Sequence, residues 1–275
     1  MGAELPTTML RVRDKQGRPV VNVRADQLKA EINGNPANVT SLTPAGKPAA
    51  ILVLDVSGST KATWKESTAA AKQLLESAGE NVAAFVFRER IEASAIGRSK
   101  SEELLDQLSK QGPPKGIAAT ALYDTLVEVA GRVTTRNAAI IVISDGGDNA
   151  SRLSSDATIA KFSGSSWPAV FGLILDYDEP GPRHRDRERF RKTAAASGGL
   201  ALYPSSASQV STTAEKLATV LGSPFAITLQ PSRPTTGSAE LKLEFVGAEG
   251  ISQKDIGLFH ATKITGCDGA GSVHR

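Results

Sequence analysis

Two serines and an aspartate lie within five residues in the segment Asp55-Val56-Ser57-Gly58-Ser59, directly after an apolar run. One carboxylate and two hydroxyls on a tight turn are hard oxygen donors. They suit a hard cation such as Mg2+, and they suit copper or a thiol-preferring metal poorly. Gly58 lets the turn bend back so that both hydroxyls face one point. The segment therefore predicts part of a divalent-cation site.

Two further oxygen donors stand at the ends of later predicted elements. Thr120 opens the helical segment ATALYDTL, and Asp145 ends the strand-like run IIVISD. Because open α/β sheets place ligand sites at the carboxyl ends of parallel strands, we expect both residues to approach the turn at Asp55. Mg2+ takes about six oxygens and keeps several waters, so five side chains, some acting through water, leave a position for an incoming ligand. The predicted metal ligands are Asp55, Ser57, Ser59, Thr120 and Asp145.

Each of these residues also has a simpler interpretation. Ser57 and Ser59 could cap the helix that follows them, and Thr120 could cap its own helix. Asp145, followed by two glycines, could form a common turn at the end of a strand. The occurrence of all three segments in order, each at the end of a suitable element, favours the metal site.

The elements that must position these residues alternate between strand and helix from residue 49 to residue 223. This alternation is typical of βα units in a mainly parallel sheet, and the continuous Val, Ile, Leu and Phe of the strands indicates cover on both faces. Glycines 198 and 199 end the fifth helix, where a positive φ is usual. The expected strands are 49–55, 82–87, 138–145, 169–176 and 200–204, and the expected helices are 62–78, 101–110, 121–133, 156–162, 187–196 and 207–221.

Both ends of the chain carry a different pattern, with short alternating segments typical of antiparallel strands. Asn33-Gly34 predicts a tight hairpin turn, and Pro36 predicts that the strand after it lies at a sheet edge. We expect the two ends to meet in one small β-sandwich. The predicted division is an N-terminal β segment over 1–47, an α/β domain over 48–223 and a C-terminal β segment over 224–275.

Composition excludes several classes of protein. The formal charge of +3 over 275 residues is too small to indicate a nucleic-acid partner. The single cysteine, Cys267, excludes an internal disulfide and a thiolate zinc site. No apolar run approaches the roughly 20 residues that span a bilayer, and the initial MGAELPTT lacks the features of a signal peptide.

The segments DVSGS, TALYDTL and VISDGGDNAS together resemble the metal-ion-dependent adhesion site of von Willebrand factor A domains. The sequence is most similar to the bacterial branch called the acidobacterial VWFA-related domain. Segments resembling RVRDKQGRPVVNVRADQLKAEINGNPANVTSL, ASGGLALYPSSASQV and FAITLQPSRPTTGSAELKLEF occur there too. The resemblance covers nearly the whole chain.

This resemblance implies a Rossmann-like, doubly wound, mainly parallel sheet with helices on both faces and an antiparallel edge strand near residues 88–96. It implies that Asp55, Ser57, Ser59, Thr120 and Asp145 hold the cation, which we expect to be Mg2+, with Mn2+ or Ca2+ as alternatives. It also implies a bacterial protein outside the cytoplasm. The expected function is adhesion to another protein whose Asp or Glu completes the metal shell, without catalysis.

Loops around the predicted cation would supply specificity for that partner. The loops expected to form this rim are 61–64, 112–119 and 148–154. Trp64 is a candidate for a central binding residue, and packing against its own helix is the alternative.

Two other functions remain open. In a phosphohydrolase of the haloacid dehalogenase type, Asp55 would be the nucleophile, but the position of its general acid is occupied by Ser57. The three histidines, His184, His260 and His274, form no hydrolase grouping with a serine. A structural module with an empty metal site is the other alternative. The sequence does not identify the partner or the oligomeric state.

Overall fold

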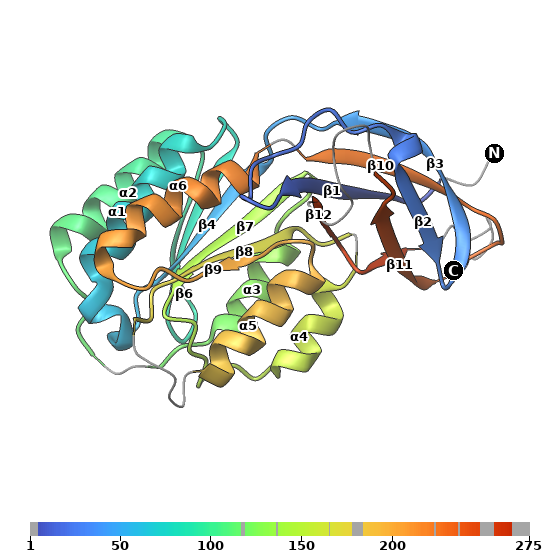
Figure 1. Ribbon diagram of the computed structural model, residues 1–275. Coiled ribbons are helices and arrows are strands. Elements are labelled where there is room, and N and C mark those ends of the chain that lie inside the picture. Colours follow the sequence, from blue (N-terminus) through green and yellow to red (C-terminus); the bar gives the residue numbers. More distant parts are fainter. Residues whose placement is uncertain are drawn as a thin grey trace.

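The computed structural model describes residues 5–116, 119–135, 137–164, 166–177, 184–222, 224–235, 237–247 and 256–265. Cys267 and His274 lie outside these ranges. A six-stranded sheet flanked by helices stands beside a seven-stranded sheet (Figure 1). Within the described ranges, no helix is both long enough and apolar enough to span a membrane.

The six-stranded sheet has the order β6-β5-β4-β7-β8-β9. All neighbours pair in parallel except β6, which runs antiparallel to β5 at one edge, within the range that the resemblance implied. The strands are β4 (Ala49–Asp55), β5 (Val82–Phe87), β6 (Ile91–Ile96), β7 (Ala138–Ser144), β8 (Ala169–Ile174) and the short β9 (Ala201–Leu202). The chain is therefore a mixed α/β protein.

Helices cover both faces of this sheet because alternate strand residues point to opposite sides. Leu52 and Leu54 of β4 pack in a core with α1, α2 and α6, whereas Ile51 and Val53 pack in a second core with α3, α4 and α5 (Figure 1). The helices are α1 (Trp64–Ser77), α2 (Arg98–Gln111), α3 (Leu122–Gly131), α4 (Ser155–Phe162), α5 (His184–Ala196) and α6 (Val210–Leu221), with 3-10 turns η1 (Ala25–Gln27), η2 (Gly58–Thr63) and η3 (Ala207–Gln209).

The two glycines after α5 serve different purposes. Gly198 has a φ of +81°, as the sequence predicted for the end of this helix. At Gly199 an added Cβ would lie 1.9 Å from the carbonyl oxygen of Val170, so the backbone of β8 passes too close for any side chain. Gly199 thus allows the chain after α5 to return alongside β8.

The seven-stranded sheet is antiparallel and joins both ends of the chain in the order β12-β1-β10-β3-β2-β11-β13. A single curved sheet around its own apolar core takes the place of the sandwich that we expected (Figure 1). Its strands are β1 (Thr7–Asp14), β2 (Leu28–Ile32), β3 (Asn35–Pro44), β10 (Phe225–Pro231), β11 (Ser238–Phe245), β12 (Ile256–His260) and β13 (Lys263–Thr265).

The hairpin at Asn33-Gly34 is confirmed, because both residues have positive φ, +49° and +72°, between the paired Ile32 and Asn35. The prediction from Pro36 was wrong, since β3 lies between β2 and β10 in the interior of the sheet. The last β3 residue paired with β10 is Ala37. Beyond it the carbonyl oxygen of Pro36 accepts from the N–H of Ser232 at 3.2 Å, and the missing N–H of Pro36 falls where this ladder ends.

Two buried arginines of β1 fill the contact between the sheets. Leu10 and Val12 face the core of the antiparallel sheet, whereas Arg11 and Arg13, only 1% and 2% exposed, point the other way. The Arg11 guanidinium lies 5.0 Å from the ring centre of Phe171 in β8.

Arg13 donates hydrogen bonds to the carbonyl oxygens of Val220 and Gly222 at the carboxyl end of α6. Burial lowers the pKa of Arg11 to about 9, with a further contribution from Arg13, and lowers the pKa of Arg13 to about 10.

The chain crosses between the two sheets twice, and the crossings lie side by side. The first follows Pro44 of β3 and the second precedes Phe225 of β10. These two residues are paired in the sheet, and the backbone N–H of Ala45 donates to the carbonyl oxygen of Pro224 at 2.9 Å.

Candidate metal centre

Asp55 is the last residue of β4 and is fully buried. Its Oδ1 accepts a hydrogen bond from the backbone N–H of Ser57 at 2.8 Å, and its Oδ2 accepts one from the Ser144 hydroxyl at 2.6 Å. One oxygen is thus held by the turn after β4 and the other by the neighbouring strand β7. Ser144 was not among the predicted site residues, although it lies in the VISD motif directly before Asp145.

The two serines of the turn face each other. Ser57 is fully buried and Ser59 half-buried, with their Oγ atoms 2.9 Å apart. Ser57 precedes the 3-10 turn η2, yet its side chain makes no capping hydrogen bond to that turn. The capping interpretation therefore does not account for Ser57, whose hydroxyl is directed to Ser59.

Thr120 lies one residue before the N-cap of α3, which is Ala121, so capping does not account for Thr120 either. Its backbone N–H donates to Oδ1 of Asn149 at 2.8 Å, and its carbonyl oxygen accepts from the N–H groups of Asn149 and Ala150 at 3.0 and 3.1 Å. Asp145 is buried, and its Oδ1 accepts from the N–H of Gly147 at 3.0 Å. The turn interpretation of Asp145 is thus correct as local structure and leaves open a second role.

The loop after Asp145 is fixed onto the first turn of α3. Asp148 accepts hydrogen bonds from the Tyr123 N–H at 3.0 Å and the Ser151 hydroxyl at 2.5 Å. Asp124 in turn accepts from the N–H groups of residues 152 and 153. We call Asn149, Asp148 and Asp124 the α3 clasp. These residues were missed in the sequence because their partners are backbone groups that only the folded chain brings close.

The five predicted residues thus come together to different degrees. Direct hydrogen bonds join Asp55, Ser57 and Ser59. Asp145 follows Ser144, which binds Asp55, and Thr120 is held by the loop that follows Asp145. Among the described residues, no hydrogen bond joins the Thr120 hydroxyl to the other four.

Electrostatics at this site favour a cation. The pKa of Asp55 is raised to about 6. Burial is the largest cause and raises it, hydrogen bonds from Ser144 and Ser57 lower it, and the charge of Asp145 raises it. Two buried carboxylates therefore repel each other, and no basic side chain is among the groups that act on Asp55. The described residues contain no cluster of three or more His, Cys, Asp or Glu. The donors here are two carboxylates and hydroxyls, a set that fits a hard divalent cation.

Trp64 begins α1 and is 7% exposed, which supports the packing interpretation over an exposed binding residue. His260 lies in the antiparallel sheet, with Nδ1 2.8 Å from the carbonyl oxygen of Ala261 and its pKa lowered by burial. The side chain of His184 lies outside the described part. The structure therefore brings no described histidine into the candidate centre.

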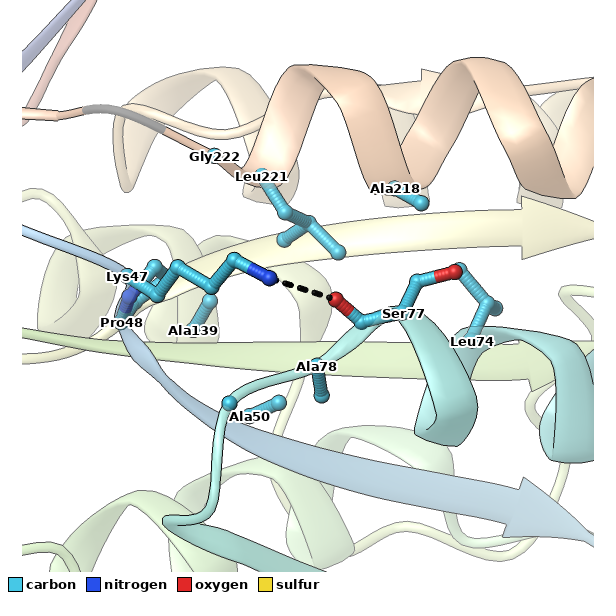
Figure 2. Close-up of a pocket in the computed structure, with 11 residues that line it drawn as sticks. Lys47, Pro48, Ala50, Leu74, Ser77, Ala78, Ala139, Ala218, Leu221 and Gly222 are labelled. Atoms are coloured by element: carbon cyan, nitrogen blue, oxygen red, sulfur yellow. Dashed lines mark hydrogen bonds between the residues drawn. The ribbon is translucent and has the colours of Figure 1, made fainter.

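A small pocket opens at the opposite, amino end of β4, between the ends of α1 and α6 (Figure 2). Lys47 extends across it and donates to the carbonyl oxygen of Ser77 at 3.4 Å, where a cation complements the carboxyl end of α1. Because Ala50 lines this pocket and Asp55 ends the same strand, the pocket is not part of the candidate metal centre.

No protein-family profile matches the chain, and no curated protein matches it. Proximal thread matrix protein 1 from the mussel byssus is similar in structure, with a TM-score of 0.50 and 14% identity over 70% of this chain and 51% of that one. Another structure of the mussel protein has a zinc-occupied MIDAS motif, the abbreviation for metal-ion-dependent adhesion site. This chain spans about half the length of the mussel protein.

Two bacterial structures are also similar. A von Willebrand factor type A protein from Catenulispora acidiphila has a TM-score of 0.49 and 13% identity over 96% of this chain and 75% of that one. BatB from Bacteroides thetaiotaomicron has a TM-score of 0.46 and 16% identity over 62% and 97%. Similar structures thus include a von Willebrand factor A domain. At 14% identity, the likeness to the mussel protein shows the fold alone.

Proposed function

We propose that this chain binds one divalent cation, Mg2+ first, and through it binds another protein that contributes an Asp or Glu. The residues that would hold the cation are Asp55, Ser57, Ser59, Thr120 and Asp145. The observation that carries the proposal is the environment of the buried Asp55. Hydrogen bonds hold both of its carboxylate oxygens, and burial and the charge of Asp145 raise its pKa.

The chain's own residues prepare this site. Ser144 and the Ser57 N–H orient the Asp55 carboxylate, and the α3 clasp holds Thr120 beside the loop of Asp145. A bound cation supplies the positive charge that attracts a partner carboxylate, a charge-assisted contact strengthened by partial desolvation. No bond is made or broken in this mechanism.

We further assign residues 48–223 to a Rossmann-like, doubly wound von Willebrand factor A-type domain, and residues 1–47 and 224–275 to one accessory β unit. The cores on both faces of the six-stranded sheet and the mutual pairing of the chain ends support this division. The family resemblance supports a place outside the cytoplasm, which fractionation of the source cells would test.

Calorimetric titration with Mg2+, Mn2+ and Ca2+ tests the metal. We expect one site per chain, and a melting temperature that rises with metal because the ion binds the folded state. Asp145→Ala should abolish both effects, whereas Asp156→Ala, at an exposed position on α4, should retain them. No binding at millimolar metal would favour the structural module with an empty site.

A phosphatase screen with Mg2+ separates adhesion from phosphohydrolase chemistry. We expect no turnover. Metal-dependent turnover that disappears in Asp55→Asn would overturn the adhesion proposal.

A further inference from the structure

A second pocket, of about 350 Å3, lies directly beside the candidate metal centre. Val56, the neighbour of Asp55, forms part of its wall. Arg88 forms another part, and its carbonyl oxygen accepts from the N–H of Ala121 at 2.7 Å, one residue after Thr120. The pocket therefore adjoins two of the three segments that carry the proposed ligands.

Its inner wall is apolar. Val86 and Leu104 line it, from β5 and α2. Trp64 lines it too, but its Nε1 atom is buried out of reach of solvent, so only the apolar part of the indole is available to an occupant. An occupant that places an apolar side chain against this wall is favoured, because apolar surface is removed from water.

The rim of this pocket carries an excess of positive charge. Arg88 is paired with Glu92 at 3.2 Å, whereas Lys115 makes no ion pair with the acidic side chains that the structure describes. The positive charge of the Lys115 side chain is thus left uncompensated. This charge attracts an acidic ligand, as does a cation in the adjoining centre.

We propose that this pocket, which we call the Trp64 pocket, receives an apolar side chain of the same partner segment whose carboxylate meets the metal. The inference rests on the proposed function and narrows its partner to an acidic segment with an apolar residue beside the acid. A volume of about 350 Å3 falls in the range of roughly 300 to 1,000 Å3 of pockets that hold small ligands.

The test uses the full chain and two synthetic peptides, Gly-Leu-Gly-Asp-Gly-Leu-Gly and the same peptide with both leucines replaced by serine. With Mg2+ present, we expect the leucine peptide to bind about tenfold more tightly, because burying an apolar side chain is favourable. It should shift the NMR signal of the Trp64 indole N–H and leave that of Trp167 in place. Chelation of the metal should weaken the binding of both peptides.

Two variants locate the effect. Ala93→Phe fills the pocket from β6 and should abolish the preference for leucine, whereas Ser94→Phe, exposed on the next position of that strand, should keep it. Calorimetric Mg2+ binding should stay unchanged in both. If Mg2+ binds but the leucine peptide binds no better than the serine peptide, or not at all, the pocket proposal alone is overturned. If Mg2+ does not bind, both proposals fail.

Discussion

Ser144 of β7 donates its hydroxyl to Asp55 of β4 at 2.6 Å, and the same oxygen accepts from the N–H of Gly146 at 3.0 Å. One hydroxyl thus connects the first carboxylate of the candidate centre to the turn that carries Asp145. Groups behind metal ligands in this way fix the direction of the ligand and tune its basicity. Ser144 is therefore a positioning residue for the proposed cation.

Ser144→Ala should weaken Mg2+ binding about tenfold to a hundredfold, the usual effect of losing such a support. Titration calorimetry measures the change. Ser151→Ala, which removes a hydroxyl from the loop after Asp145 without touching Asp55, is the matched control and should have a smaller effect. Equal Mg2+ affinity in Ser144→Ala and the unaltered chain would contradict a positioning role.

Asp55 should make the stability of the metal-free protein depend on pH. Its pKa is raised from 3.8 to about 6 in the folded state, so the folded state binds this proton more tightly than the unfolded chain. The resulting stabilisation is present below pH 3.8 and lost as pH rises through 6. The shift of about two pH units corresponds to about 3 kcal/mol at most.

Asp55→Asn removes this dependence. With a chelator present, the free energy of unfolding of the unaltered chain should therefore fall relative to that of the variant as the pH rises from 4 to 7. Urea titrations measure this difference. Asp156→Asn, an exposed control, should show no such gain. Parallel pH profiles for Asp55→Asn and the unaltered chain would rule out the raised pKa.

Asn149→Ala should loosen the α3 clasp. It removes the acceptor for the Thr120 N–H and should lower stability by about 1 to 2 kcal/mol, with weaker metal binding. Asn149→Asp keeps an oxygen acceptor and should restore much of the metal affinity. Calorimetry of both variants checks this. If Asn149→Ala matched the unaltered chain in stability and in metal affinity, the hydrogen bond from Thr120 would be unimportant.

The two buried arginines should respond in opposite directions to replacement by methionine. Nε of Arg11 has no acceptor among the described residues, so Arg11→Met removes an expensive buried charge and should stabilise the fold, by about 1 to 3 kcal/mol. Arg13→Met leaves the carbonyl oxygens at the end of α6 without their donor and should destabilise it by about 1 to 3 kcal/mol. Thermal unfolding of both variants measures the contrast, and a shift in the same direction would contradict it.

Gly199→Ala should destabilise the protein by about 3 kcal/mol or more, because the new methyl group would meet the backbone of Val170. Gly222→Ala is the control: its new Cβ would lie 3.7 Å from the nearest atom, an ordinary contact. Urea unfolding compares the two. Similar unfolding midpoints would show that β8 and the segment after α5 can move apart.

Much of the α/β layer was predictable because strand periodicity and helical spacing are local signals. Asp55 and Asp145 were proposed as ligands for the same reason, since each ends an apolar run, and this assignment stays a prediction. Ser144 and Pro36 show the limit: their environments depend on which strands are neighbours, and that order is a property of the whole sheet. The Trp64 pocket likewise forms only when β5, β6 and α2 meet.

The paired Pro44 and Phe225 define where the six-stranded layer joins the rest of the molecule. Since β3 and β10 are already antiparallel neighbours at that point, a tight turn of two to five residues could link them directly and form a hairpin. The six-stranded layer is therefore topologically a loop insertion into a continuous β-sheet, and it could be exchanged for another inserted domain without changing the order of the strands that carry it.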